Sequence, residues 1–197
     1  FVPAGVVNLS LGGPGIGPFG QQAVEDALET GVIIVAAAGN SNSSAPHFPS
    51  DLPGVIKVGA TDLLGNKAPY SNFGGNFIVA PGGNLAADAN GDDIADGVIS
   101  TVWNQVSDTP GYNLYQGTSM ATPHVSGVIS LMLSADADLT REQVMTILEE
   151  TATVPPALAA SPSGGRHLFF GVGIINAFQA VASAAGFSQT DPRIGIS

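Results

Sequence analysis

One serine is a candidate nucleophile. Ser119 lies in the segment 117–124, which reads Gly-Thr-Ser-Met-Ala-Thr-Pro-His and leads into small and apolar residues. That run predicts a buried helix with Pro123 in its first turn. Backbone N–H groups at a helix start lack acceptors and are positively polarised, so they can stabilise the oxyanion formed when a serine attacks a carbonyl. From these residues alone, the alternative is that Thr118 or Ser119 merely caps the helix.

A second group of residues has the spacing of a site for a hard cation. Oxygen ligands recur at alternate positions, namely Asp88, Asn90, Asp92, the Ile94 carbonyl and Asp96. This matches the opening of an EF-hand-type loop, and such oxygens are the ligands that calcium takes. The sixth position is Asp93 rather than Gly, and the twelfth is Ile99 rather than Glu. We expect a structural calcium ion here, with a solvated acidic turn as the alternative.

A glycine-rich segment resembles a phosphate-binding loop only superficially. Residues 15–20 read Gly-Ile-Gly-Pro-Phe-Gly, between a predicted strand and a predicted helix. Pro18 removes an N–H group close to where a phosphate would bind. No acidic residue ends the next strand, 32–38, to contact a ribose. We therefore interpret this segment as a loop and not as a dinucleotide site.

Composition narrows the function classes. The 197 residues include 5 Lys and Arg against 16 Asp and Glu, which gives a net charge of −11. This balance disfavours nucleic acid and anionic membranes as partners, since both are bound by clustered cations. There is no cysteine, which excludes disulfides, thiol catalysis and Cys-ligated zinc. No apolar run is long enough to span a membrane.

Strands and helices alternate around these candidate residues. The apolar run 32–38 is typical of a parallel strand covered on both faces. Thr140 and Gln143 form a capping box ahead of another helix. We expect strands at 6–11, 32–38, 55–60, 77–80 and 99–102, and helices at 21–30, 123–133, after 140 and at 173–185. This order indicates a three-layer α/β fold.

The segment 117–127, Gly-Thr-Ser-Met-Ala-Thr-Pro-His-Val-Ser-Gly, resembles the nucleophile motif of the subtilase family of serine peptidases. Residues 7–13 resemble the family's substrate-binding strand, and residues 35–40 resemble the strand that ends in its oxyanion asparagine. The resemblance implies a subtilisin-like fold with a mostly parallel sheet between helices. It makes residues 1–186 the C-terminal part of the catalytic domain and residues 187–197 a tail or linker.

The resemblance also implies roles in hydrolysis of protein peptide bonds. Ser119 is the implied nucleophile, and the Asn40 amide joins the Ser119 N–H as an oxyanion donor. The implied substrate-binding residues are Ser10, Leu11, Gly12, Ala37 and Gly39. Their small apolar walls suggest a pocket for sizeable apolar side chains, with His47 near its floor. Pro49 matches a proline whose peptide bond is cis in the family.

A subtilase also requires an aspartate and a histidine, and the family carries both upstream of the strand that contains Ser10. None of the histidines present (His47, His124 and His167) matches the catalytic base. We therefore expect these two residues from an upstream segment, or from an N-terminal fragment of the same protease as a partner chain. The alternative is a catalytically inert fragment or a calcium- or peptide-binding module. The resemblance, together with the acidic charge, favours a secreted, extracellular protein.

Overall fold

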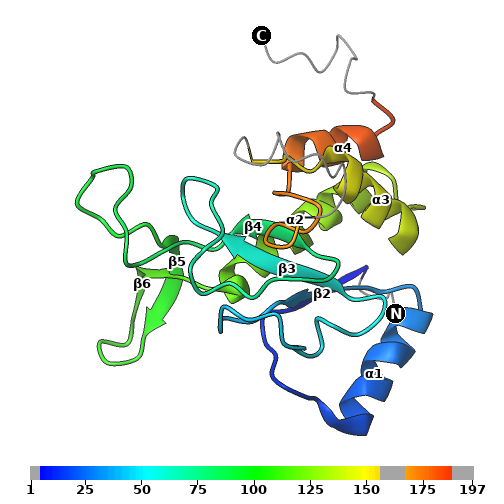
Figure 1. Cartoon of the computed structure of the whole chain (residues 1–197), viewed down its shortest axis with the longest axis horizontal. Helices are drawn as coiled ribbons and strands as arrows, with labels where there is room; N and C mark the ends of the chain where they lie inside the picture. Colours follow the sequence, from blue (N-terminus) through cyan, green and yellow to red (C-terminus); the bar gives the residue numbers. More distant parts are fainter. Residues whose placement is uncertain (1–4, 156–166, 188–197) are drawn as a thin grey trace.

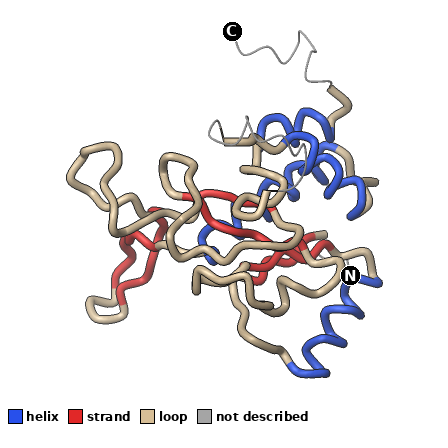
Figure 2. The backbone as a smooth tube through the Cα atoms, in the orientation of Figure 1, coloured by secondary structure: helices blue, strands red, loops and turns tan. Residues whose placement is uncertain are grey.

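The computed structural model describes residues 5–155 and 167–187. A four-stranded parallel sheet has the order β1 (Val6–Leu9), β2 (Ile33–Ala37), β3 (Ile56–Thr61) and β4 (Ile78–Pro81) (Figures 1 and 2). Every residue of β2 and β3 is buried. This confirms the covered parallel strand that the run 32–38 predicted, and the short strand predicted at 55–60 is buried as well.

The helices differ in how many strands of this sheet they contact. Helix α2 (Thr118–Ala135) packs against all four strands, and α4 (Ala177–Ala184) packs against α2 and α3 (Arg141–Thr151). Helix α1 (Gly17–Glu29) joins β1 to β2 and contacts β2. The main core therefore lies between the sheet and α2, and buried residues of α3 and α4 extend it beside α2. The α/β architecture agrees with the expectation from the sequence.

Helix boundaries differ from the predicted ones at the N-terminal ends. Helix α2 begins at Thr118, so Pro123 lies inside the helix and not in its first turn. Helix α1 begins at Gly17 with a proline next, and α4 begins only at Ala177. The capping box of Thr140 and Gln143 is present at the start of α3, as predicted.

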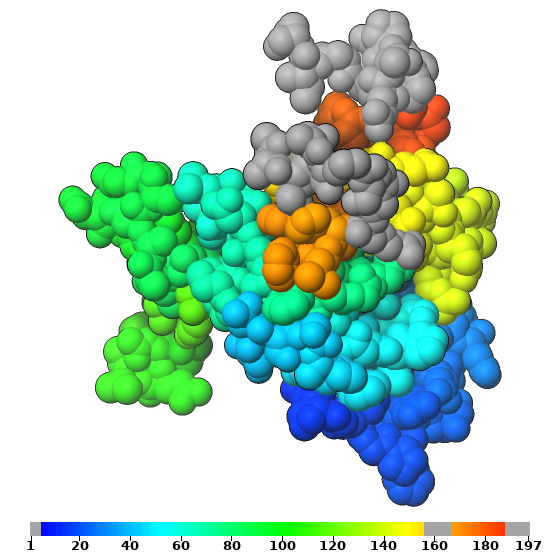
Figure 3. All heavy atoms as spheres, in the orientation of Figure 1, coloured from blue at the N-terminus to red at the C-terminus, as the bar shows by residue number. Residues whose placement is uncertain are grey.

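An antiparallel hairpin extends from the sheet and was only half predicted. Strand β5 (Val98–Asn104) pairs with β6 (Thr109–Tyr115) along its full length. The hairpin projects away from the helices (Figures 1 and 3). The predicted strand 99–102 falls in β5, whereas β6 was missed because Pro110 and Gly111 are poor strand residues. Most of the predicted tail, residues 188–197, lies outside the described residues.

Candidate active site

The candidate catalytic residues meet at one edge of the parallel sheet. Ser10 follows the carboxyl end of β1, and Asn40 follows the carboxyl end of β2 by three residues. The first turn of α2, which carries Ser119, reaches the same edge. Loops at the carboxyl ends of parallel strands commonly form the ligand crevice of an open α/β sheet.

Ser10 and Ser119 are joined by two hydrogen bonds. The Ser119 hydroxyl donates to the Ser10 carbonyl at 3.1 Å, and the Ser10 hydroxyl donates to the Ser119 carbonyl at 2.8 Å. In a regular helix the Ser119 carbonyl would accept the N–H of residue 123, but Pro123 has none. The proline inside α2 therefore leaves an acceptor for Ser10, and Ser119 is tied to the end of β1.

Asn40 is oriented by Thr118, the residue before the candidate nucleophile. Its side-chain oxygen accepts the Thr118 N–H and the Thr118 hydroxyl, both at 2.9 Å. The same hydroxyl accepts the Gly39 N–H at 3.1 Å, so its proton is directed toward Asn40. This network fixes which end of the amide faces Thr118, and it turns the Asn40 NH₂ group toward the exposed side.

Two N–H donors border one small space beside Gly117. A Cβ built on Gly117 would lie 3.4 Å from Asn40 Nδ2 and 3.6 Å from the Ser119 nitrogen. Neither nitrogen has a hydrogen-bond acceptor within the described ranges. Gly117 has φ +147°, a conformation that favours glycine. The space is suited to an oxygen that gains negative charge while Ser119 reacts.

A tyrosine that sequence reasoning missed supports this turn. The Tyr70 hydroxyl lies 2.8 Å from both the Gly82 and the Gly83 carbonyl oxygens, and it accepts the Gly117 N–H at 2.9 Å. Burial raises the pKa of Tyr70 to about 12. The phenol therefore stays protonated and holds Gly117 against the segment that follows β4. No local pattern around Tyr70 signals this contact, since its partners are 12 to 47 residues away.

The implied substrate-binding residues line both sides of the site. Ser10 and the exposed Leu11 lie past the end of β1, whereas Ala37 and Gly39 are buried at the end of β2. His47 lies between the two walls. A Cβ added to Gly12 would be 2.5 Å from His47 Nε2, and one added to Gly39 would be 2.9 Å from Nδ1.

His47 belongs to a well-braced loop. The Phe48–Pro49 peptide bond is cis, as predicted. Phe48 forms an antiparallel bridge with Gly13, and the His47 N–H donates to Asp51 at 2.7 Å. Burial lowers the pKa of His47, while the nearby Asp51 carboxylate opposes that shift. The imidazole is therefore neutral at pH 7.

No catalytic base contacts Ser119 within residues 5–155 and 167–187. The only hydrogen bond of the Ser119 hydroxyl there goes to Ser10. His124 lies on the same helix, with Nδ1 2.9 Å from the Met120 carbonyl. His167 packs on Phe169 and Phe170 in a separate loop. The described residues thus bring Ser119 together with the Asn40 amide and the Ser119 N–H, and no histidine among them contacts the Ser119 hydroxyl.

The acidic loop uses its carboxylates on its own backbone. Asp88 accepts the N–H groups of Gly91, Asp92 and Asp93, while Asp92 accepts that of Ile94. Asp96 accepts the Ala89 N–H at 2.7 Å, and the Asn90 amide donates to Asp92. Across the described residues, no three His, Cys, Asp or Glu side chains converge as a metal site. To bind calcium, the carboxylates of this loop would have to turn from these backbone N–H groups toward one common point.

Comparison with known proteins establishes the family. The model of the subtilase family matches residues 3–174. The chain therefore belongs to the subtilase family.

Individual relatives agree with this assignment. An extracellular protease of Xanthomonas campestris is 41% identical over 92% of this chain, and subtilisin DY of Bacillus licheniformis is 36% identical over 87%. A solved protease structure from Pseudoalteromonas arctica has a TM-score of 0.78 at 38% identity over 92% of this chain. The matches cover 29%, 54% and 52% of those proteins, so this chain spans about half their length or less.

Proposed function

We propose that this chain is the nucleophile-bearing part of a serine endopeptidase that cleaves peptide bonds in proteins. The observation that carries the proposal is the space beside Gly117, which Asn40 Nδ2 and the Ser119 nitrogen both border. A serine that only caps a helix has no reason to share such a space with a second, oriented donor. The names of the relatives, an extracellular protease and a subtilisin, support the same reaction class.

The proposed reaction follows the scheme of serine peptidases. Ser119 Oγ adds to the carbonyl carbon of the scissile bond, and its proton passes to a histidine base. The oxyanion is held by Asn40 Nδ2 and the Ser119 N–H. The C–N bond breaks as the histidine returns the proton to the leaving amine. Water then hydrolyses the acyl-enzyme by the same route.

We further propose that the histidine and its aspartate partner come from a part of the natural protease outside these residues, either upstream in the chain or in an N-terminal fragment bound to it. Mass spectrometry of the natural protein tests this directly. We expect a species larger than 19.7 kDa or a second polypeptide. A lone 19.7 kDa chain that cleaves peptides at ordinary protease rates would contradict the proposal.

Covalent labelling of the natural protein tests the role of Ser119. A fluorophosphonate reacts with an activated serine, so we expect a single adduct on the peptide that contains Ser119. The Ser119→Ala variant should remain unlabelled, whereas Ser130→Ala should be labelled normally, because Ser130 only donates to the Ser126 carbonyl within α2. A folded protein that takes up no label would favour an inert binding module instead.

We propose that His47 forms the floor of the specificity pocket between Gly12 and Gly39. Its imidazole shortens the pocket, which favours apolar side chains of medium size over the longest ones. As the pH falls through the lowered pKa of His47, the ring gains a proton and a positive charge. Cleavage after Glu relative to Leu should then increase as the pH falls, and His47→Gln should abolish this trend. An unchanged ratio in both proteins would contradict this role.

Calcium remains a proposal for the loop that contains Asp88, Asn90, Asp92 and Asp96. It is supported by the ligand spacing, and by a hollow of about 300 Å³ that Asn90, Asp92 and Asp96 line together with Asp62. Thermal unfolding with calcium and with a chelator tests it. We expect a higher Tm with calcium and no difference in Asp92→Asn. An equal Tm in both conditions would contradict a structural ion.

We propose that the natural protein is secreted and acts on polypeptides outside the cell. The relative from Xanthomonas is named an extracellular protease. Among the described residues, no helix is long and apolar enough to cross a membrane. Detection of the natural protein in the culture medium, with a cytoplasmic enzyme as the control for lysis, tests this proposal.

A further inference from the structure

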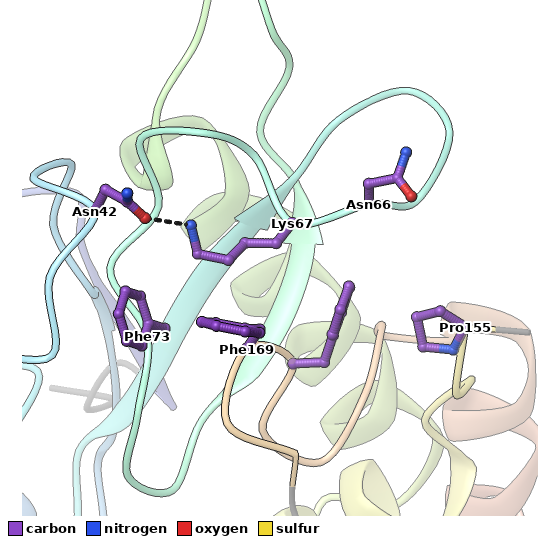
Figure 4. Close-up of a pocket in the computed structure, with 7 residues that line it drawn as sticks. Asn42, Asn66, Lys67, Phe73, Pro155 and Phe169 are labelled. Atoms are coloured by element: carbon purple, nitrogen blue, oxygen red, sulfur yellow. Dashed lines mark hydrogen bonds between the residues drawn. The ribbon is translucent and has the colours of Figure 1, made fainter. Parts of the chain in front are cut away.

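An aromatic cavity lies beside the loop that follows Asn40. It has a volume of about 500 Å³ and is separate from the space beside Gly117. Figure 4 shows Lys67 and Asn42 at one side, and the rings of Phe73 and Phe169 below them. The side chains that matter for its chemistry are Asn42, Lys67, Phe73, Pro155, Phe169 and Phe170.

The aromatic walls are held in place by their neighbours. Phe73 and Phe169 meet edge to face, with ring centroids 5.0 Å apart and planes at 71°. The Phe73 N–H donates to the Ser43 carbonyl, and the Gly74 N–H donates to the Leu168 carbonyl. These bonds connect three loops distant in sequence. The cavity is therefore a preformed apolar surface, which lowers the entropic cost of binding a ligand.

Lys67 gives this cavity a positive charge. Its ammonium lies 5.4 Å from the centre of the Phe73 ring, and donates to the Asn42 side-chain oxygen at 2.8 Å and the Ala68 carbonyl at 3.1 Å. An ammonium has three donors, so one remains available. Burial lowers the pKa of Lys67, and no carboxylate contributes to that shift.

Among the residues that the structure describes, Lys67 differs from the other cations because no carboxylate pairs with it. The described residues contain two other strong cations, and both are paired: Lys57 with Asp51 at 2.8 Å and Arg141 with Glu142 at 2.7 Å. In a chain with a net charge of −11, an ammonium beside aromatic rings and without a carboxylate partner in the described ranges is complementary to an apolar anion. A neutral apolar ligand would leave the ammonium without a counter-charge, and a cation would be repelled.

We propose that this cavity binds the carboxyl-terminal residue of a peptide when that residue has an apolar side chain. Lys67 takes the terminal carboxylate, and the rings of Phe73, Phe169 and Phe170 enclose the side chain. The Asn42 NH₂ group, which makes no hydrogen bond within the described ranges, donates to the preceding peptide carbonyl. This proposal rests on the proposed function, because peptides with a new carboxyl terminus would be produced by each peptide-bond cleavage.

Calorimetric titration of the Ser119→Ala protein tests the proposal without turnover. The probes are acetyl-Ala-Phe with a free carboxylate, its carboxyl-terminal amide, and 3-phenylpropanoate. We expect the acid to bind at least about tenfold tighter than the amide, the size of one charge-assisted hydrogen bond. Equal binding of acid and amide would overturn the proposal. Equal binding of 3-phenylpropanoate would overturn its peptide part.

Variants assign the signal to this cavity. Lys67→Met should weaken binding of the acid at least about tenfold, and Lys67→Arg should retain it. Arg141→Met removes the same charge elsewhere and should bind normally.

Phe169→Ala, at a side chain 40% exposed, gives a second variant with little risk to folding and should also weaken binding. Binding unchanged in both Lys67→Met and Phe169→Ala would place the peptide in the substrate groove and overturn the proposal. Because Ser119 is absent from the assay, failure here is distinguishable from failure of the proposed catalysis.

Discussion

The active-site edge of the sheet and the β5–β6 hairpin are held together in opposite ways. At the edge, hydrogen bonds join Ser10 to Ser119 and Asn40 to Thr118, pairs that are 109 and 78 residues apart. In the hairpin, the side-chain bond from Trp103 reaches Asp108, five residues away. Strands β5 and β6 each have only the other as an extensive partner among the described elements.

This difference has a physical consequence. The geometry around Ser119 exists only when β1, the loop after β2 and α2 are all in place, so it depends on the whole core. The hairpin is fixed by neighbours in sequence and is largely exposed. Equivalent substitutions in the two regions should therefore have very different effects, and the following predictions test that expectation.

The largest effect is expected for Asn40→Asp. This change keeps the side-chain oxygen that accepts from Thr118 but removes the N–H donors. We expect kcat of the natural protease to fall about 10²–10³-fold, the loss known for removing one such donor in a subtilisin, with little change in Tm. The matched control is Asn104→Asp in the hairpin, where the oxygen accepts from Val106 and Ser107. An equal loss of kcat in both variants would remove the distinction between the two regions.

The next effect concerns stability. Ser10→Ala leaves the Ser119 carbonyl oxygen without a hydrogen-bond donor, because Pro123 has no N–H to replace the lost Ser10 hydroxyl. We expect a loss of about 1–3 kcal/mol in the free energy of unfolding, measured in urea. In a Pro123→Ala background, the restored N–H of residue 123 can donate to Ser119, so Ser10→Ala should cost less. The same cost in both backgrounds would contradict the link between the proline and Ser10.

The sequence predicted those parts of the molecule whose signal is local. The apolar run 32–38 indicated a buried parallel strand because every residue there is apolar, whereas 55–60, which contains Lys57, indicated only a short strand. Ser119 and Asn40 were proposed as site residues through motifs that resemble a known family, and the structure brings the two side by side. The Ser10–Ser119 bonds and the Tyr70 bridge were not predicted, because their partners are brought together only by the folded sheet. Strand β6 (Thr109–Tyr115) was missed because it contains Pro110 and Gly111, which are poor strand residues.

A smaller effect is expected for Tyr70→Phe, which removes the hydroxyl that bridges Gly117 to Gly82 and Gly83. The Gly117 N–H keeps a second acceptor in the Gly82 carbonyl, so we expect a loss of about 1 kcal/mol in unfolding free energy. The matched change Tyr112→Phe, in the hairpin and 75% exposed, should be nearly neutral. Equal losses in the two variants would show that the bridge contributes nothing.

The raised pKa of Tyr70 also predicts a difference in pH dependence between the parent protein and Tyr70→Phe. The folded pKa is about 12 against 10.0 for the free side chain. The folded state therefore retains this proton when the unfolded state has lost it, and the stabilisation is present below pH 10 and lost as the pH rises to 12. Unfolding free energy between pH 10 and 12 should fall more steeply in the parent protein than in Tyr70→Phe. Parallel curves would contradict the role of burial.

The smallest effect is expected for Trp103→Ala in β5. The indole is 58% exposed, and its one hydrogen bond, to Asp108 at 3.1 Å, is also exposed. Removing so large a side chain from a core would cost several kcal/mol, but here little apolar surface is buried, so we expect a change within about 0.5 kcal/mol in urea unfolding. A loss above about 1 kcal/mol would mean that Trp103 packs against a part of the natural protein outside the described residues. The hairpin would then depend on distant contacts as the active-site edge does, and the contrast between the two regions would fail.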